Sequence, residues 1–231
     1  DNKPKQEHFK CVEKPVEDVP EGKILIKVLY ISVDPFSRAL MTDHPKDKQV
    51  VHESVPLNTP MKGLAIGQVI ISKNKSWNKG VLVHGSFGWQ SYEISDGTMI
   101  YPIDDTHIPA SAYLGVLGLT GFTAWGGMTL VGKPEKGKTV LVSSGAGATG
   151  SVAGQIAKIK GCRVVGIAGS DEKVKWMVEE AGFDAGINYK VGNLADSIKR
   201  EVPEGVDLYF DNVGGEMLET VLDHMNLFGT I

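Results

Sequence analysis

Hydrophobic and polar residues follow two different patterns in the two halves of the chain. In the first half, short runs of β-branched and aromatic residues follow turn residues, as in Gly22 to Tyr30, which predicts strands. Similar runs span residues 64–72, 80–84 and 89–94. The polar stretch from Asp43 to Pro60 contains three prolines and predicts a mobile loop. The first half is therefore predicted to be a β-rich domain.

From residue 139 onward, apolar strands alternate with segments of helical periodicity. Strand-like runs begin near Thr139, Arg163, Ala185, Val206 and Gly229. The apolar residues between them recur at helical spacing: Val152, Ile156 and Ile159; Val174, Met177 and Ala181; Leu194 and Ile198; Met217, Val221 and Met225. Almost continuously apolar strands are typical of a parallel sheet that is covered on both faces. These residues therefore predict a doubly wound α/β domain.

The two patterns divide the chain into three parts. Residues 111–131, rich in Gly, Leu and Ala, predict a helix or a pair of helices in which Trp125 and Met128 pack. We predict a β-rich substrate domain over 1–110, a connecting helical segment over 111–138 and the α/β domain over 139–231.

The two ends of the sequence suggest a longer protein. There is no initial Met, and Phe228 to Ile231 resemble the beginning of a buried strand that stops without a turn. We therefore expect a C-terminal part of the α/β domain to be missing from this chain.

Composition and charge exclude several classes of protein. The chain has 231 residues, 42% of them hydrophobic, and a net charge of −4, which argues against disorder and against a basic surface for nucleic acid. No apolar run reaches the roughly 18 residues of a membrane span, and no signal peptide begins the chain, so we expect a cytoplasmic protein. The two cysteines and six scattered histidines lack the spacing of zinc ligands, so no metal site is predicted.

One glycine motif indicates a dinucleotide site. Gly145-Ala-Gly147-Ala148-Thr149-Gly150 follows the strand at Thr139 and opens a helix, as the GxGxxG motif of dinucleotide-binding proteins does. The first glycine allows a tight turn, the second lets the backbone approach a pyrophosphate, and the third lets the helix pack on the strand. Amides at the helix start would then face the phosphates. The alternative is that these glycines serve only to form a tight turn between the strand and the helix.

The end of the second strand indicates which dinucleotide binds. An NAD site places an acidic residue there, on the ribose 2′-hydroxyl. In this chain Gly169-Ser170 leaves room for a 2′-phosphate and Lys173 supplies positive charge, which favours NADP(H). Asp171 is the competing candidate for an NAD site, but an acid in the first turn of a helix also complements the helix dipole.

A second phosphate motif is rejected. Residues 132–139 match GxxxxGK[ST], but a P-loop must leave a strand and enter a helix. This stretch leaves a helical segment and enters the strand at Thr139, so we predict a surface loop.

The order of these parts resembles a known family. The resemblance rests on residues 33–38, 117–124, the Gly-rich loop, 169–173, 182–184, 188–190 and 211–215. In them the chain resembles the zinc-independent medium-chain dehydrogenase/reductases, and most closely the prostaglandin reductase, leukotriene B4 dehydrogenase and alkenal double-bond reductase family. The resemblance implies a GroES-like first domain and a Rossmann second domain.

The resemblance also implies which residues form the site. The NADP contacts would be Gly147, Ala148, Thr149 and Gly150 at the pyrophosphate, Lys173 and Tyr189 near the 2′-phosphate, and Asn212 after the fourth strand. The substrate wall would include Phe87, Gly88 and Trp89. As alternatives, Tyr189 would only cover the sheet edge and Asn212 would only form an Asx turn. The family usually has Tyr where Phe36 stands, and its proposed phenol donor lies beyond Ile231, so no catalytic residue is named.

The activity that the resemblance implies is NADPH-dependent reduction of the carbon–carbon double bond of an α,β-unsaturated aldehyde or ketone, such as an alkenal, an enone or a 15-oxoprostaglandin. The alternatives are an NADPH:quinone oxidoreductase of the same superfamily and a non-catalytic NADPH-binding scaffold. The expected partner is an apolar small molecule, with no nucleic acid and no membrane, and a homodimer is left open.

Overall fold

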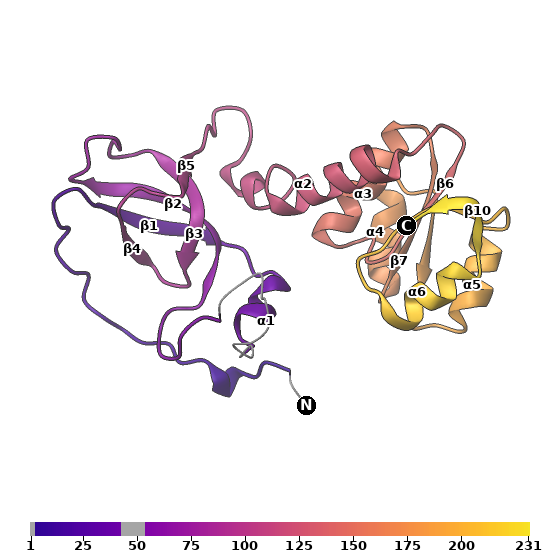
Figure 1. Ribbon diagram of the computed structural model, residues 1–231, viewed down its shortest axis with the longest axis horizontal. Helices are drawn as coiled ribbons and strands as arrows, with labels where there is room; N and C mark the ends of the chain where they lie inside the picture. The colour runs from indigo at the N-terminus through magenta and orange to yellow at the C-terminus, as the bar shows by residue number, and fades with distance from the viewer. Residues whose placement is uncertain (1–2, 43–53) are drawn as a thin grey trace. The chain divides into compact units, whose positions relative to one another are not determined.

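The computed structural model describes residues 3–42 and 54–231. The chain divides into two compact units, Asp1–Leu114 and Gly115–Ile231 (Figure 1). Each unit has its own hydrophobic core. Most of the loop predicted over 43–60 lies outside the described residues, and its described part, 54–60, contains turns but no helix or strand. In the described ranges, none of the helices has the length and apolar character needed to cross a membrane.

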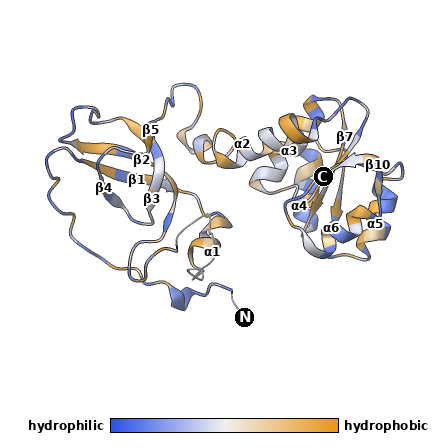
Figure 2. Ribbon diagram, viewed as in Figure 1, coloured by the Kyte–Doolittle hydropathy of each residue, from blue (hydrophilic) through white to orange (hydrophobic). Residues whose placement is uncertain are grey.

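The first unit is built on an antiparallel sheet with the strand order β4-β1-β2-β3-β5. Its buried residues, among them Ile24, Val69 and Phe87, come from alternate positions of the strands, and Figure 2 shows hydrophobic residues along β1 and β2. The predicted β-rich domain is confirmed. The elements of this unit are η1 (Gln6–His8), β1 (Ile24–Ile31), α1 (Phe36–Leu40), β2 (Lys62–Ser72), β3 (Leu82–Gly88), β4 (Tyr92–Ser95), β5 (Ile100–Pro102) and η2 (Ala110–Leu114).

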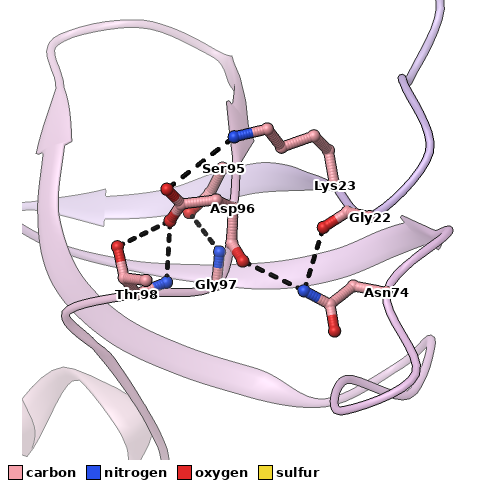
Figure 3. A network of polar contacts seen from close by, with 7 residues as sticks. All are labelled: Gly22, Lys23, Asn74, Ser95, Asp96, Gly97 and Thr98. Atoms are coloured by element: carbon pink, nitrogen blue, oxygen red, sulfur yellow. Dashed lines mark hydrogen bonds and ion pairs between the residues drawn. The ribbon is translucent and has the colours of Figure 1, made fainter.

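A polar network ties together three loops of this sheet (Figure 3). The side-chain amide of Asn74 donates to the backbone carbonyls of Gly22 and Asp96, both over 3.0 Å. Asp96 Oδ1 accepts from the amide and the hydroxyl of Thr98 at 2.8 and 2.6 Å, and Lys23 Nζ lies 3.7 Å from the other carboxylate oxygen. The network fixes the start of β1 against the loops that follow β2 and β4.

The second unit is built on a parallel sheet with the strand order β10-β9-β6-β7-β8. If β6 to β10 are numbered 1 to 5 and the sheet is followed from β8 to β10, the order is 3-2-1-4-5. This is the strand order of a dinucleotide-binding α/β fold. The strand order reverses between β6 and β9, where such folds bind their ligand. The predicted doubly wound domain is confirmed. Its strands are β6 (Thr139–Val142), β7 (Arg163–Ala168), β8 (Ala185–Asn188), β9 (Val206–Phe210) and β10 (Met225–Thr230).

Helices cover both faces of the parallel sheet. Val140 and Val142 point to one face, where Ala153 and Met177 pack, and Leu141 points to the other, where Ile198 packs. Successive residues of a strand alternate in direction, which is why both faces need apolar cover. The helices are α2 (Leu119–Gly126), the π-helix η3 (Gly127–Gly132), α3 (Ala148–Ile159), α4 (Asp171–Glu179), α5 (Leu194–Glu201) and α6 (Gly215–Leu222).

The last helix and strand are present, but the predicted boundary between them is wrong. Met225 does not lie on the helix, because α6 ends at Leu222 and the His224 amide bonds to the Val221 carbonyl in a turn. The last strand begins at Met225 rather than near Gly229. It is not fully buried either, since Leu227 is 86% exposed and Phe228 is 95% exposed.

The segment predicted to connect the domains is partly in each unit. The helix pair expected within 111–131 corresponds to η2, α2 and η3. η2 lies in the first unit, whereas α2 and η3 belong to the second and contact α3 there. Met128 is fully buried, as predicted, but Trp125 is about half exposed.

Candidate functional site

The loop between β6 and α3 leaves a row of amides at the start of the helix. The Gly147 amide donates to the Ser144 carbonyl over 2.8 Å, and Ser144 has a φ of +51°. The first bond of the helix is the one that Ser151 donates to the Gly147 carbonyl. The amides of Ala148, Thr149 and Gly150 precede that bond, so helix geometry directs them beyond the helix start. They are suited to bind the oxygens of an anion.

The three motif glycines allow close approach rather than an unusual backbone. A side-chain carbon at Gly150 would lie 2.3 Å from the Ser144 carbonyl oxygen, and one at Gly145 would lie 2.7 Å from Met177 Sδ. Gly150 is therefore required by the backbone of the loop, and Gly145 leaves room for the Met177 side chain. A side-chain carbon at Gly147 would approach only Ser144, at 3.0 Å, and Gly147 has an ordinary φ of −81°. Of the three, Gly147 is the one that packing constrains least.

Polar groups join the ends of β6 and β9, where the strand order reverses. Ser143, directly after β6, receives a bond from the Asn212 backbone amide at Oγ and one from the Asn212 side chain at its carbonyl, over 2.7 and 2.8 Å. The Asx turn after β9 is formed by Asp211, whose Oδ1 accepts from the amides of Val213 and Gly214. Asn212 therefore links the two strand ends, and the Asx turn considered for it belongs to its neighbour.

Burial and hydrogen bonds shift the pKa values of Tyr209 and Asp211, next to this loop, in opposite directions. Tyr209 is 1% exposed and donates to Asp211 Oδ1 over 2.9 Å. Burial and the adjacent carboxylate raise the pKa of Tyr209 far above its usual value. Burial also acts to raise the pKa of Asp211, but the donors around the carboxylate outweigh it and lower that pKa. The pair is therefore a phenol bonded to a carboxylate at neutral pH.

Side chains from the turn after β8 lie over the end of β7. Ser170 caps α4 by accepting from the Lys173 amide over 3.3 Å. A side-chain carbon at Gly169 would lie 3.1 Å from Tyr189 Cε1 and 3.4 Å from Lys190 Cε. The side chains of Tyr189 and Lys190 thus reach the C-terminal end of β7. Of the residues that the sequence assigned to a 2′-phosphate, Tyr189 lies against Gly169 at this strand end, and Lys173 follows in the first turn of α4.

The acidic residue near this strand end is already bonded. Asn188 donates from Nδ2 to Asp171 Oδ1 over 2.7 Å and accepts the Lys190 amide at Oδ1 over 3.1 Å. Neither Asn188 nor Lys190 is among the site residues predicted from the sequence. Their position at the end of the third strand of the α/β domain is the sequence signal that points to them.

The residues predicted for the substrate wall lie in the first unit and differ in exposure. Phe87 is part of the core, and Gly88 is buried, with its amide bonded to Glu93 over 2.7 Å. Trp89 is half-buried and stacks on Phe9, with ring centroids 6.2 Å apart. Trp89 Nε1 is buried and has no hydrogen-bond partner among the described residues. Of the two aromatic side chains, only that of Trp89 is partly exposed.

Two further sequence predictions concern phosphate and metal. The second glycine motif does run from η3 into β6, and its Gly137 amide is bonded to the Gly161 carbonyl over 3.0 Å, so the rejection of a P-loop is confirmed. Within residues 3–42 and 54–231, no group of three or more His, Cys, Asp or Glu side chains could hold a metal ion.

Comparison with known proteins gives the family. Residues 1–103 match the family described as "N-terminal domain of oxidoreductase", and residues 148–231 match "Zinc-binding dehydrogenase". Prostaglandin reductase 1 of Mus musculus is 39% identical over 232 residues, which cover 99% of this chain and 67% of that protein. The chain belongs to the zinc-independent medium-chain dehydrogenase/reductases.

Other members of the medium-chain dehydrogenase/reductases are similar to this chain in sequence and in structure. The NADP(+)-dependent 2-alkenal reductase of Nicotiana tabacum is 43% identical over 217 residues, covering 92% of this chain and 62% of that protein. Crystalline CurA of Vibrio vulnificus in complex with NADPH superimposes with a TM-score of 0.90 at 35% identity, covering 98% of this chain and 66% of CurA. The chain spans 61–67% of the length of the curated relatives that it matches.

Proposed function

We propose that this protein is an NADP-dependent oxidoreductase that uses NADPH to reduce the carbon–carbon double bond of α,β-unsaturated aldehydes or ketones. The cofactor half of the proposal rests on one observation. At the end of β7, where an NAD site needs an available acid, Asp171 is bonded to Asn188, while Tyr189 and Lys190 lie over Gly169. A phosphate on the ribose suits that arrangement better than a free hydroxyl.

The residues of the second unit fit NADPH in three places. The amides of Ala148, Thr149 and Gly150 are available to the pyrophosphate at the reversal of strand order. Lys173 and Tyr189 would hold the 2′-phosphate, and Asn212, fixed to Ser143 by two bonds, would contact the cofactor beyond the pyrophosphate. Bound NADPH would supply the hydride for the double bond, and the protein would orient the reactants and exclude water.

The substrate half of the proposal rests on the relatives and on one side chain. The relatives named 2-alkenal reductase, prostaglandin reductase and curcumin reductase are 36–43% identical to this chain. Trp89 supplies an apolar, partly exposed surface that suits an enal or enone. The likeness to Escherichia coli quinone oxidoreductase complexed with NADPH is at 22% identity, with a TM-score of 0.66, and supports the fold alone.

A substrate screen tests the proposal. The purified protein would be assayed for NADPH oxidation with alkenals, enones and an ortho-quinone. We expect turnover of the enals and enones. Turnover of the quinone alone would favour a quinone reductase, and NADPH binding without turnover of any acceptor would favour a non-catalytic binding protein.

A further inference from the structure

Lys190 lies close to Gly169, the residue that follows β7. It follows β8 directly, and its Cε lies 3.4 Å from the position of a side-chain carbon on Gly169. Its Nζ is 5.9 Å from the ring centroid of Tyr189, within the range of a cation–π contact. The ammonium group therefore stands beside the tyrosine and at the same strand end as Lys173.

Asn188 fixes the backbone that carries this lysine. Its Oδ1 accepts the Lys190 amide over 3.1 Å, while its Nδ2 donates to Asp171 Oδ1 over 2.7 Å. A single side chain thus holds the backbone of Lys190 and bonds one oxygen of the Asp171 carboxylate, the acid considered for a ribose hydroxyl. Both effects favour a phosphorylated ribose.

The ammonium groups of Lys173 and Lys190 are not engaged in ion pairs with any described residue. In the described part of the chain, neither Lys173 nor Lys190 has a carboxylate within the 4.0 Å of an ion pair. Lys175 on the same helix does, because its Nζ lies 3.8 Å from Glu179. Asp171 and Glu172 lie in the first turn of the same helix, so what the two lysines offer is two ammonium groups without an ion pair to a described residue, each able to bond a phosphate oxygen, rather than a net positive surface.

We propose that Lys190 is a second cationic contact for the 2′-phosphate of NADPH, and that Asn188 is the positioning residue that holds it there. The inference rests on the proposed cofactor. A ribose 2′-phosphate carries nearly two negative charges at neutral pH, and two ammonium groups can each donate charge-assisted hydrogen bonds to it.

Binding measurements on matched variants test the role of Lys190. Dissociation constants for NADPH, NADH, adenosine 2′,5′-bisphosphate and 5′-AMP would be measured by calorimetry for the wild type, Lys190→Ala, Lys190→Arg and the control Lys175→Ala. We expect Lys190→Ala to raise the dissociation constants of the two 2′-phosphorylated ligands by about tenfold and to leave those of NADH and 5′-AMP unchanged. Lys190→Arg should retain most of the affinity, and Lys175→Ala all of it.

The outcomes separate this inference from the proposed function. A wild type that does not prefer NADPH to NADH would overturn the proposed cofactor. A wild type with that preference and an unchanged Lys190→Ala, or equal losses for all four ligands, would overturn only the role of Lys190. For Asn188, we expect Asn188→Ala to weaken NADPH binding in the wild type but not in Lys190→Ala; equal losses in both backgrounds would overturn the positioning role.

Discussion

The hydroxyl of Tyr209 donates to Oδ1 of Asp211 over 2.9 Å, and the same oxygen accepts the amides of Val213 and Gly214. A side chain buried in the sheet therefore helps to hold the loop that begins at the end of β9. The adjoining Asn212 is bonded to Ser143 at the end of β6. The loop at the reversal of strand order is thus fixed by two contacts, one from Tyr209 to Asp211 and one between Asn212 and Ser143.

Tyr209→Phe should lower the free energy of unfolding by about 1–2 kcal/mol, because it removes a buried donor from a carboxylate. Urea denaturation measures the loss. Tyr92→Phe is the control, since Tyr92 is 39% exposed on β4. Equal effects of the two substitutions would show that the bond to Asp211 contributes nothing beyond the loss of a hydroxyl.

Acid should destabilise the second unit through its bonded carboxylates. Burial acts to raise the pKa values of Asp184 and Asp211, but the donors around each carboxylate outweigh it and lower both pKa values. A lowered pKa in the folded state contributes stability above the unfolded value, near 3.8, which is lost as the pH falls through the folded value. We expect the free energy of unfolding to fall steeply below a pH of about 4.

The matched variant for this pH effect is Asp184→Asn. Asp184 accepts from Lys158 Nζ at both carboxylate oxygens, over 2.7 and 2.8 Å. The amide keeps an acceptor for the Lys158 and Val164 donors but does not titrate. The variant should be less stable at neutral pH and lose less stability between pH 5 and 3. An unchanged slope over that range would argue against a contribution from this carboxylate.

Lys173→Ala should weaken NADPH binding by about 1–3 kcal/mol, the scale of a charge-assisted contact, and should hardly change NADH binding. The two dissociation constants can be measured by fluorescence titration. Lys175→Ala removes the same charge from the same helix and serves as the control. Equal losses for NADPH and NADH in Lys173→Ala would contradict the 2′-phosphate assignment.

Gly147→Val should block NADPH binding, because its side chain would cover the backbone that the pyrophosphate approaches. The fold should tolerate the change better than Gly150→Ala, whose new carbon would lie 2.3 Å from the Ser144 carbonyl oxygen. NADPH titration and thermal unfolding of both variants separate the two roles. Unchanged NADPH affinity in Gly147→Val would count against the site.

Local signals in the sequence were sufficient for most of the second unit. The strands beginning at Thr139, Arg163, Ala185 and Val206 were predicted at the residues where they start, because each apolar run follows polar or turn residues. The last strand was misplaced because Met225 continues the helical spacing of Met217 and Val221. The turn at His224 depends on bonds to Val221 and Val206 that the spacing does not reveal.

Contacts between distant segments could not be predicted in the same way. The bond from Asn188 to Asp171 joins residues 17 positions apart, and it exists because the ends of β7 and β8 are neighbours in the sheet. The packing of Phe183 is similar. Side-chain carbons at Gly145, Gly154 and Gly166 would each lie within 3.2 Å of its ring, so three glycines from three elements leave the space that it occupies.

The packing of Phe183 against these glycines predicts a compensating pair of substitutions. Phe183 is 3% exposed, so Phe183→Ala should lower the free energy of unfolding by about 3–5 kcal/mol through the cavity it leaves. Gly154→Ala should also be destabilising, because its carbon would lie 2.0 Å from Phe183 Cζ. In Phe183→Leu, which vacates part of the ring volume, Gly154→Ala should cost less than in the wild type. Urea denaturation of the wild type, Gly154→Ala, Phe183→Leu and the double variant gives the coupling energy. Strictly additive losses would mean that the ring and Gly154 do not share this space.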